Sequence, residues 1–444
     1  MMRVLAVGGG AREHAIVAAL SRSGAEVYAA LKNRNPGIAR AAKESTFVDE
    51  TDVAKVVEFA EAKRVELAIV GPEAPLEAGL ADGLVAAGIP TASPSKAAAR
   101  IETSKSFMRE LMLRHRVDGA VKFAVTEDLE GVKAALDAMG LEVVVKPTGL
   151  TGGKGVKVFG EHMTSKEDIL AYADEIFSQR IGGTPRVVVE ERLVGEEFTV
   201  QAFCDGRKVV PMPAVQDHKR AYEGDKGPNT GGMGSYSQDD GLLPFLRREE
   251  YDKAVAIIQQ AVDALRAEGC EYRGTLYGQF MVTKDGPKVI EFNARFGDPE
   301  AMNVLSLLSS DFTGICQRMA SGGIAPVDVS FASKASVCKY VVPQGYGTKS
   351  LSGEEITVDE RSVSMEGALL YYASVNEKDG RVFTTTSRSV GVVGIAESID
   401  EAERAVERAL SHISGKIAIR HDIGRREMLD AKVMRMDSIR GGRA

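Results

Sequence analysis

The sequence predicts a multidomain protein of the α/β and α+β classes, and three observations support this prediction. The chain has 444 residues, and at roughly 150 residues per domain this length suggests about three domains. Strand and helix patterns alternate near the N-terminus, whereas strands dominate the middle of the chain. Apolar residues make up 44% and charged residues 27% of the chain, which is the ordinary mixture of a globular protein.

The N-terminal part is expected to form an open parallel sheet. Its expected strands are Val4–Val7, Glu26–Leu31, Phe47–Val48, Leu67–Val70 and Ile89–Ala92. Its expected helices extend to about Arg22 and cover Val53–Ala62 and Leu76–Ala87. This alternation is typical of βαβ units. Ligands on such sheets bind beyond the carboxyl ends of the strands, and both Gly8–Gly10 and Gly71–Glu73 directly follow a strand.

The middle of the chain is expected to contain more strands than helices. The expected strands are Val121–Val125, Val143–Lys146, Val156–Phe159, Val187–Glu191, Glu197–Phe203, Lys208–Ala214, Thr275–Thr283 and Lys288–Phe292. The expected helices are Ser104–Val117 and Tyr251–Glu268. Between them, Gln216–Ser237 carries little periodic pattern, so we expect a long loop there. Loops of that length are usually functional or disordered.

The C-terminal part is expected to form a separate, small α+β domain. Its expected elements are the strands Ser336–Val342, Ala368–Ser374 and Ser389–Ala396 and the helix Glu401–Ser411. The tail Ile439–Ala444 is basic and contains glycines, so we expect a frayed end. The predicted domains therefore cover residues 1–103, 104–333 and 334–444.

Composition excludes several classes of function. Lys and Arg total 56 and Asp and Glu total 63, so the net charge is −7, and a nucleic-acid-binding protein would need a basic surface instead. No apolar run approaches the roughly 18–20 residues of a membrane span, and the first glycines come too early for a signal peptide. The four cysteines are far apart, which indicates reduced thiols in a cytoplasmic protein without a zinc site.

A glycine-rich segment predicts a phosphate-binding loop. A strand delivers Lys146, and the loop that follows contains Gly152, Gly153, Lys154 and Gly155 before the next strand. Glycines allow backbone N–H groups to approach anionic oxygens closely, and a nest of such groups binds phosphate. The segment is not a Walker A loop, because no G-x-x-x-x-G-K-[ST] pattern fits and no helix follows. The alternative is a hairpin with solvated lysines.

The segment Val188–Thr199 suits a nucleoside. The strand ends with the acceptors Glu190 and Glu191, a turn contains Leu193, and a further acid follows at Glu197. Backbone groups at such a strand end could read the adenine edge, and a carboxylate could accept hydrogen bonds from the two ribose hydroxyls. The alternative is an exposed acidic turn.

The strand near residue 290 carries ligands of the kind that a magnesium ion prefers. Glu291 and Asn293 are two residues apart and therefore face the same side of the strand. Both offer oxygen atoms, Gln279 on the preceding strand could supply a third, and Arg295 could hold an anion. The alternative is a half-buried edge strand. The stretch 216–234 is a further candidate for a functional loop, because it combines acidic residues, basic residues and glycines. The alternative is a solvated loop without a function in the site.

The N-terminal Gly8–Ala15 segment is similar to a dinucleotide-binding turn, but two features argue against that function. The position of the third fingerprint glycine is occupied by Glu13, although close packing of the helix on the strand requires a residue without a side chain there. The second strand is followed by Lys32–Arg34 and not by the acid that binds a ribose 2′-hydroxyl. With Arg12 nearby, the turn would still hold a phosphate monoester. We interpret His14 as a helix residue satisfied locally.

Together these segments resemble the ATP-grasp superfamily and, within it, the phosphoribosylamine–glycine ligase family of purine biosynthesis. The matching stretches are GGGAREHA from Gly8, Gly71–Glu73, Lys146–Val158, Val189–Glu197, Gln216–Ser237 and Glu291–Glu300. QDHKR and GPNTGGMG in one loop, followed by EFNARFGDPE, are specific to this family. Two stretches depart from it: Asn33–Gly37 replaces a G-N-x-G-T run, and Thr103–Lys105 replaces G-S-K.

The resemblance implies an ATP-grasp core over residues 105 to 320, with a mobile lid, about 118–195, that closes over ATP between two sheets. It implies ATP-dependent joining of glycine to 5-phosphoribosylamine, which gives glycinamide ribonucleotide, ADP and phosphate through glycyl phosphate. Mg²⁺ or Mn²⁺ would be required. We expect a cytoplasmic monomer or weak homodimer with small-molecule substrates and without nucleic acid or membrane partners.

The resemblance also implies roles for individual residues. ATP would contact Lys105, Lys146, Gly152, Gly153, Lys154, Gly155, Glu190, Glu191, Leu193 and Glu197. The metal would be bound by Gln279, Glu291 and Asn293. The other substrates would contact Gly9, Gly10, Arg12, Pro72, Glu73, Lys219, Thr230, Gly231 and Gly232. Glycine and the reacting centre would lie near Asp217, Arg295 and Asp298.

Two other functions remain open at the level of sequence. An ATP-grasp ligase or carboxylase that uses bicarbonate or formate would share the ATP and metal residues. A nucleotide-binding regulator without turnover is the second alternative, but binding alone does not need both the lysines and the metal-type oxygens.

Overall fold

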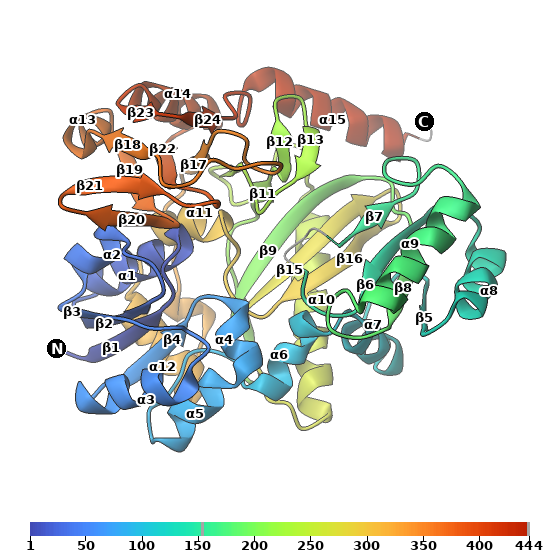
Figure 1. Cartoon of the computed structure of the whole chain (residues 1–444), viewed down its shortest axis with the longest axis horizontal. Helices are drawn as coiled ribbons and strands as arrows, with labels where there is room; N and C mark the ends of the chain where they lie inside the picture. The colour runs from blue at the N-terminus through green and yellow to red at the C-terminus, as the bar shows by residue number, and fades with distance from the viewer. Residues whose placement is uncertain (152–154, 442–444) are drawn as a thin grey trace.

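The computed structural model describes residues 1–151 and 155–441. In Figure 1 the N-terminal part lies below the C-terminal part on one side of the molecule, and the middle of the chain fills the other side. The glycine-rich residues Gly152, Gly153 and Lys154 lie outside the described residues.

The N-terminal part forms the open parallel sheet that the sequence predicts. Its strands, in the spatial order β3-β2-β1-β4, are β1 (Arg3–Val7), β2 (Glu26–Leu31), β3 (Glu44–Phe47) and β4 (Leu67–Val70). Its helices are α1 (Ala11–Arg22), α2 (Pro36–Ala41), α3 (Val53–Ala62), α4 (Glu73–Ala78), α5 (Leu80–Ala86) and α6 (Lys96–Thr103). The register pairs Val7 with Val70. The turns that follow β1 and β4 therefore lie side by side at the carboxyl edge.

Two expectations for this part were wrong. The single helix expected over Leu76–Ala87 is two helices, because Gly79 adopts a left-handed backbone (φ +92°) between α4 and α5. The expected strand Ile89–Ala92 is only an isolated bridge between Thr91 and Ala68. A run of apolar residues alone does not distinguish these outcomes.

The middle of the chain contains two four-stranded sheets. The larger, in the order β10-β9-β15-β16, consists of β9 (Glu196–Asp205), β10 (Val209–Pro211), β15 (Arg273–Thr283) and β16 (Gly286–Asn293). The smaller, in the order β5-β8-β6-β7, consists of β5 (Phe123–Thr126), β6 (Val143–Pro147), β7 (Lys157–Val158) and β8 (Val187–Glu191). The accompanying helices are α7 (Lys105–Arg114), α8 (Leu129–Met139), α9 (Lys166–Gln179), α10 (Arg248–Ala267), α11 (Glu300–Leu307) and α12 (Phe312–Ser321), with a 3₁₀ turn η1 (Pro326–Asp328).

The smaller sheet has a hydrophobic core of its own with α8 and α9. Val132 and Leu136 of α8 and Ile169 and Ile176 of α9 belong to a buried cluster that is separate from the two larger ones. The smaller sheet and these two helices therefore pack as one unit around their own core.

The expectation of a long loop over Gln216–Ser237 was wrong. The segment contains β11 (Gln216–Asp217), β12 (Arg220–Tyr222), β13 (Lys226–Asn229) and β14 (Gly234–Ser237). Strands β12 and β13 form a hairpin of their own. Strands of two to four residues contain too few alternations to show a period in the sequence.

The C-terminal part contains a six-stranded and a four-stranded sheet. The larger has the order β11-β14-β17-β22-β19, with β24 beside β17, and the smaller has the order β20-β21-β18-β23. The strands are β17 (Ala335–Pro343), β18 (Glu355–Val358), β19 (Ala368–Tyr372), β20 (Val375–Lys378), β21 (Arg381–Thr384), β22 (Val390–Ala396), β23 (Ile413–Gly415) and β24 (Ile417–Ile419). The helices are α13 (Glu360–Met365), α14 (Ile399–Leu410) and α15 (Arg426–Arg440). Strand β14 pairs with β17, so the larger sheet includes strands from both sides of residue 334.

The C-terminal tail is ordered over more of its length than expected. Helix α15 continues to Arg440, and Nη2 of Arg440 donates hydrogen bonds to Glu250 Oε2 (2.6 Å) and to the carbonyl oxygen of Phe245 (2.8 Å). The expectation of a frayed end was therefore wrong for Ile439–Arg440, and residues 442–444 lie outside the described residues.

Polar contacts join the N-terminal and C-terminal parts. Nδ2 of Asn35 donates to the carbonyl oxygen of Tyr372 (2.7 Å), and Nδ2 of Asn33 donates to that of Val375 (2.9 Å). The backbone N–H of Tyr372 donates to Nδ1 of His14 (2.9 Å), so His14 is a helix residue with a partner, but this partner lies far away in the chain and not locally as expected. Asn33–Gly37, which departs from the family pattern, thus connects two parts of the chain.

All four cysteines lie in the described part of the chain and are free thiols. The described residues include no helix with the length and apolar character needed to cross a membrane.

Candidate functional site

A cavity of about 810 Å³ lies between the two sheets of the middle part and reaches the hairpin and both other parts of the chain. Many of the predicted site residues line it: Arg12, Glu73, Lys146, Glu190, Glu191, Leu193, Glu197, Asp217, Lys219, Thr230, Gly231, Gln279, Glu291, Asn293, Arg295 and Asp298. Outside the lining are Gly9, Gly10, Pro72, Lys105, Gly155 and Gly232. The cavity therefore gathers residues that lie far apart in the sequence.

Two cations surround a buried carboxylate at one end of the cleft. Nζ of Lys146 lies 2.7 Å from Glu190 Oε2, and Nε of Arg109 lies 2.7 Å from Glu190 Oε1. Burial by itself raises the pKa of Glu190, but Arg109 and Lys146 outweigh it and lower that pKa to about 2. The side chain of Glu190 is thus held by these cations.

Lys105 begins α7 and lies next to the glycine-rich loop. Its Nζ donates to the carbonyl oxygen of Gly149 at 2.9 Å. Burial lowers the pKa of Lys105, while the charge of Glu291 opposes this shift. Lys105 lies outside the lining of the cleft, but its charge is close enough to interact with that of Lys146.

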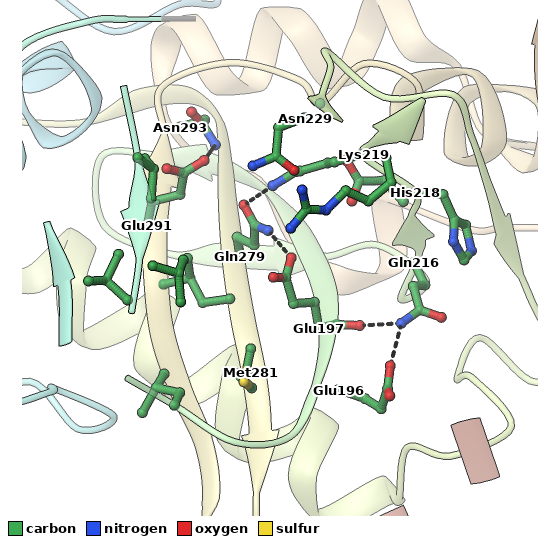
Figure 2. Close-up of a pocket in the computed structure, with 18 of the residues that line it drawn as sticks. Glu196, Glu197, Gln216, His218, Lys219, Asn229, Gln279, Met281, Glu291 and Asn293 are labelled. Carbon is green, nitrogen blue, oxygen red and sulfur yellow. Dashed lines mark hydrogen bonds between the residues drawn. The ribbon is translucent and has the colours of Figure 1, made fainter. Parts of the chain in front are cut away.

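The metal-type oxygens of β15 and β16 meet as the sequence predicts. The antiparallel register places Gln279 opposite Glu291, and Figure 2 shows the side chains of Gln279, Glu291 and Asn293 converging on the cleft. Burial raises the pKa of Glu291, but Lys219, Lys105 and Lys146 outweigh it and lower that pKa. The Glu291 carboxylate is therefore ionised in the folded protein.

The donor set suits a hard divalent cation. The Glu291 carboxylate and the Asn293 amide oxygen are ligands of the kind that Mg²⁺ prefers. Oε1 of Gln279 accepts a hydrogen bond from Lys219 Nζ (2.8 Å), so this third oxygen already has a partner. Within residues 1–151 and 155–441, no three His, Cys, Asp or Glu side chains are arranged to hold a metal ion. The Asn293 Oδ1 also accepts a hydrogen bond, from Arg295 Nη2 (3.4 Å). A cation bound here would therefore depend mainly on the Glu291 carboxylate and on substrate oxygens.

A second group of charges lies on the hairpin side of the cleft. Nε2 of Gln279 donates to Glu197 Oε2 at 2.6 Å. Burial lowers the pKa of Lys219, but the charges of Asp217 and Glu197 outweigh it and raise that pKa. Burial also raises the pKa of Asp217, against the opposing effect of Lys219. The segment between β11 and β12 thus places the cation of Lys219 among several carboxylates.

Arg295 connects the metal-type oxygens to the N-terminal part. Its guanidinium lies 3.0 Å from Glu102 Oε1 and 3.3 Å from Glu73 Oε2, and Nη2 donates to Asn293 Oδ1 at 3.4 Å. Asp298, near the same junction, forms an ion pair with Arg388 of the C-terminal part (3.0 Å). The predicted reacting centre is therefore where all three parts of the chain meet.

The glycine turn after β1 is already occupied by a carboxylate. Oε2 of Glu13 accepts a hydrogen bond from the Gly10 backbone N–H (2.7 Å), and Oε1 accepts one from Arg12 Nε (2.5 Å). A Cβ added at Gly8 would lie 2.4 Å from Glu13 Cγ. The side chain at the position of the third fingerprint glycine thus packs into the turn and takes up the Gly10 N–H.

Comparison with known proteins agrees with this geometry. Models of the N, ATP-grasp (A) and C domains of phosphoribosylglycinamide synthetase match residues 2–102, 103–301 and 336–426 respectively. The chain belongs to the phosphoribosylamine–glycine ligase family. The predicted family and fold class are therefore confirmed.

Relatives of the same family align over nearly the whole chain. The phosphoribosylamine–glycine ligase of Methanothermobacter thermautotrophicus is 52% identical over 439 residues, which are 99% of this chain and 100% of that protein. The ligase of Methanococcus vannielii is 49% identical over 443 residues, again 99% of this chain and 100% of that protein.

Solved structures share the architecture. The crystal structure of phosphoribosylamine–glycine ligase from Thermotoga maritima matches with a TM-score of 0.81 and 28% identity, over 95% of this chain and 100% of that chain. The biotin carboxylase domain of a Hydrogenobacter thermophilus carboxylase, solved with MgADP and bicarbonate, has a TM-score of 0.73 and 16% identity over 99% of this chain and 95% of that chain. The second likeness shows the fold alone.

Several residues of the ligase cleft escaped the sequence analysis. They are Arg109, Glu196, Tyr277, Glu300, Arg388, Lys432 and Arg435, with Glu102 behind them. Tyr277 lies two residues before Gln279 on β15, so strand alternation could have placed it on the same face. Arg109 and Lys432 lie on helices outside any motif, and no local pattern marks them.

Proposed function

We propose that this phosphoribosylamine–glycine ligase uses ATP to join glycine to 5-phosphoribosylamine, with glycinamide ribonucleotide, ADP and phosphate as products, in purine biosynthesis. The observation that carries the proposal is the cleft itself. It places Lys146, Glu291 and Asn293 on facing sheets, next to an ion pair between Arg295 and Glu73 of the N-terminal part. A cleft of this kind can hold a triphosphate and a second substrate at the same time.

The chemistry requires an activated acid. An amine does not displace oxide from a carboxylate, so a better leaving group must be made first. We propose that a carboxylate oxygen of glycine attacks the γ-phosphorus of ATP, which gives glycyl phosphate and releases ADP. The amine of phosphoribosylamine then attacks the acyl carbon, the C–O bond to phosphate breaks, and the amine loses a proton as the amide forms.

The residues of the cleft suit this reaction because phosphoryl transfer depends mainly on positioning and charge neutralisation. Lys105 and Lys146 would contact the phosphates of ATP, with Gly155 and the preceding glycine-rich residues above them. The backbone around Glu190, Glu191 and Leu193 would meet the adenine. Glu197 would accept hydrogen bonds from the ribose hydroxyls.

The metal and the other substrates complete the assignment. Glu291 and Asn293, with Gln279, would hold Mg²⁺ or Mn²⁺, which supplies charge neutralisation to the phosphates when bound. Asp217, Arg295 and Asp298 would bind glycine near the reacting centre. Phosphoribosylamine would contact Gly9, Gly10, Arg12, Pro72, Glu73, Lys219, Thr230, Gly231 and Gly232.

Closure of the smaller sheet would keep water from the acyl phosphate, which water would otherwise hydrolyse. The separate hydrophobic core of this sheet supports such a movement. We further propose a cytoplasmic monomer or weak homodimer that acts without nucleic acid or membrane, in keeping with its net charge of −7.

A coupled ADP-release assay tests the function. Phosphoribosylamine is generated in situ, and ADP formation is compared with and without glycine, and with bicarbonate or formate in its place. We expect ADP release only with glycine. If glycine labelled with ¹⁸O in its carboxylate is used, one labelled oxygen should pass into the released phosphate. ADP release with bicarbonate alone, or unlabelled phosphate, would contradict the proposal.

A further inference from the structure

Helix α15 lies beyond the three matched family models, the last of which ends at residue 426. Figure 1 shows the helix running from the C-terminal part over the hairpin toward the sheets of the middle part. Its buried side chains Leu429 and Met436 belong to the hydrophobic cluster that also contains Phe198 and Phe245. The helix also contacts β15, a strand of the sheet that lines the cleft.

Two cations of α15 neutralise a buried carboxylate in the lining of the cleft. Nζ of Lys432 lies 3.1 Å from Glu196 Oε2, and Nη1 of Arg435 lies 3.1 Å from Glu196 Oε1. Glu196 is only 5% exposed, whereas the side chains of Lys432 and Arg435 are 14% and 58% exposed. A buried charge that loses its partner is costly, so Lys432 is the main determinant of where Glu196 lies.

The side-chain amide of Gln216 forms hydrogen bonds that link Glu196 to Glu197. Nε2 of Gln216 donates to the carbonyl oxygen of Glu197 at 2.8 Å and contacts Glu196 Oε2 at 3.4 Å. The Glu197 carboxylate in turn accepts from Gln279 at 2.6 Å. Figure 2 shows this series of contacts along one side of the cleft. A shift of Glu196 would therefore move the backbone and the carboxylate of Glu197.

We propose that Lys432 is a positioning residue for the nucleotide: through Glu196 and Gln216 it holds Glu197 where its carboxylate accepts hydrogen bonds from the ribose of ATP. The inference rests on the proposed function, in which Glu197 binds the ribose. It makes the C-terminal helix a determinant of nucleotide selectivity, although the helix lies outside the ATP-grasp segment of the sequence.

The test compares ATP with 2′-deoxy-ATP in the full-length enzyme. The variants are Lys432→Met, Lys432→Arg and Arg440→Met. Arg440 anchors the far end of the same helix through Glu250 and has no contact with Glu196, so its variant is the matched control. The readouts are kcat, the KM for each nucleotide and the KM for glycine, together with calorimetric binding of AMP-PNP.

We expect Lys432→Met to raise the KM for ATP about tenfold or more, the effect of losing one hydrogen bond to a charged group. The KM for 2′-deoxy-ATP should rise less, because this nucleotide keeps only the 3′-hydroxyl, and the KM for glycine should change little, so the preference for ATP falls. Lys432→Arg should restore most of the preference, and Arg440→Met should keep it.

Three outcomes would overturn the inference: equal effects of Lys432→Met on both nucleotides, the same loss in Arg440→Met, or a wild-type enzyme that does not distinguish the nucleotides. If Lys432→Met does not fold, Lys432→Gln replaces it, because the polar amide removes the charge that faces Glu196 and the same loss of preference is expected. Failure of the proposed function is separate, since it would appear as absent glycine-dependent ADP release in the wild type.

Discussion

Buried carboxylates of this ligase differ in charge state because they face different cations. Arg109 and Lys146 lower the pKa of Glu190 to about 2 in spite of burial. Burial raises the pKa of Glu102 to about 7, although Arg295 opposes the shift. Glu190 thus remains ionised at any physiological pH, whereas Glu102 lies near its titration point. The neighbours of a carboxylate determine its charge more than its residue type does.

Substitution of Glu291 tests the proposed metal and phosphate end of the cleft. Glu291→Ala should lower kcat by at least about 10²-fold, the scale for losing one strong electrostatic contribution to a transition state. Lys288→Ala on the same strand, outside the lining of the cleft, is the control and should keep wild-type turnover. Near-normal kcat in Glu291→Ala would argue against its role.

At this scale, sequence patterns reveal residues that belong to motifs and miss those that support them. Glu291, Asn293 and Gln279 were predicted together because strand alternation and pairing specify their faces, and β15 and β16 pair as expected. Arg109 and Glu102 could not be predicted, because their partners Glu190 and Arg295 lie far away in the chain. Only the tertiary structure brings such pairs together.

Helix α7 joins the smaller sheet of the middle part to the larger one through one side chain. Arg109 contacts Glu190 of β8 and donates to the carbonyl oxygens of Val289 and Ile290 on β16. A single guanidinium thus connects three elements and, together with Lys146, balances the charge of Glu190 on β8.

Removal of this guanidinium should destabilise the protein. Arg109→Met should lower the free energy of unfolding by about 3–5 kcal/mol, because it leaves a buried carboxylate short of a partner. Arg114 lies on the same helix as Arg109 and forms an exposed ion pair with Glu268, which follows α10. Arg114→Met should therefore lower the free energy of unfolding by only about 0–1 kcal/mol. Urea denaturation measures both changes, and similar small values would contradict the role given to Arg109.

The break between α4 and α5 makes a second prediction. Gly79 has a left-handed backbone, and an added Cβ would meet only Lys96 Cδ at 3.8 Å. The cost of substitution is therefore backbone strain and not lack of space. Gly79→Ala should destabilise by about 1 kcal/mol, and Gly79→Asn by less, because asparagine tolerates this conformation better. Equal free energies of unfolding of the wild type, Gly79→Ala and Gly79→Asn in urea would show that the backbone at residue 79 is not strained by a side chain.

Elements with enough residues to show a period were the most predictable. The helix Val53–Ala62 and the strands Leu67–Val70 and Val187–Glu191 have the bounds that the sequence predicts. The short strands within Gln216–Ser237 were missed, because two to four residues give no usable alternation and their pairing partners include β17, about a hundred residues away.

The N-terminal and C-terminal parts of the molecule are held together partly by a neutral histidine. Burial, with the nearby charge of Arg40, lowers the pKa of His14 from about 6.5 to about 4. Between these values the unfolded chain binds a proton at this residue and the folded chain does not. The contribution of His14 to stability is therefore complete above pH 6.5 and is lost as the pH falls toward 4.

His14→Asn should weaken this pH dependence, because asparagine does not titrate while its Oδ1 can still accept from Tyr372. We expect the free energy of unfolding of the wild type to fall more steeply than that of the variant between pH 6.5 and 4. Urea denaturation across this range measures the difference. Equal slopes in the two proteins would show that His14 is not the responsible group.

The pairing of β14 with β17 has a consequence for dividing this chain into fragments. A protein cut near residue 334 would leave β14 with unpaired amide and carbonyl groups along one side. Such a fragment would present a ready template for strands from other copies and should self-associate on expression. Tags, fusions and circular permutations are therefore better placed at exposed loop tips than at the apparent seam between the second and third family segments.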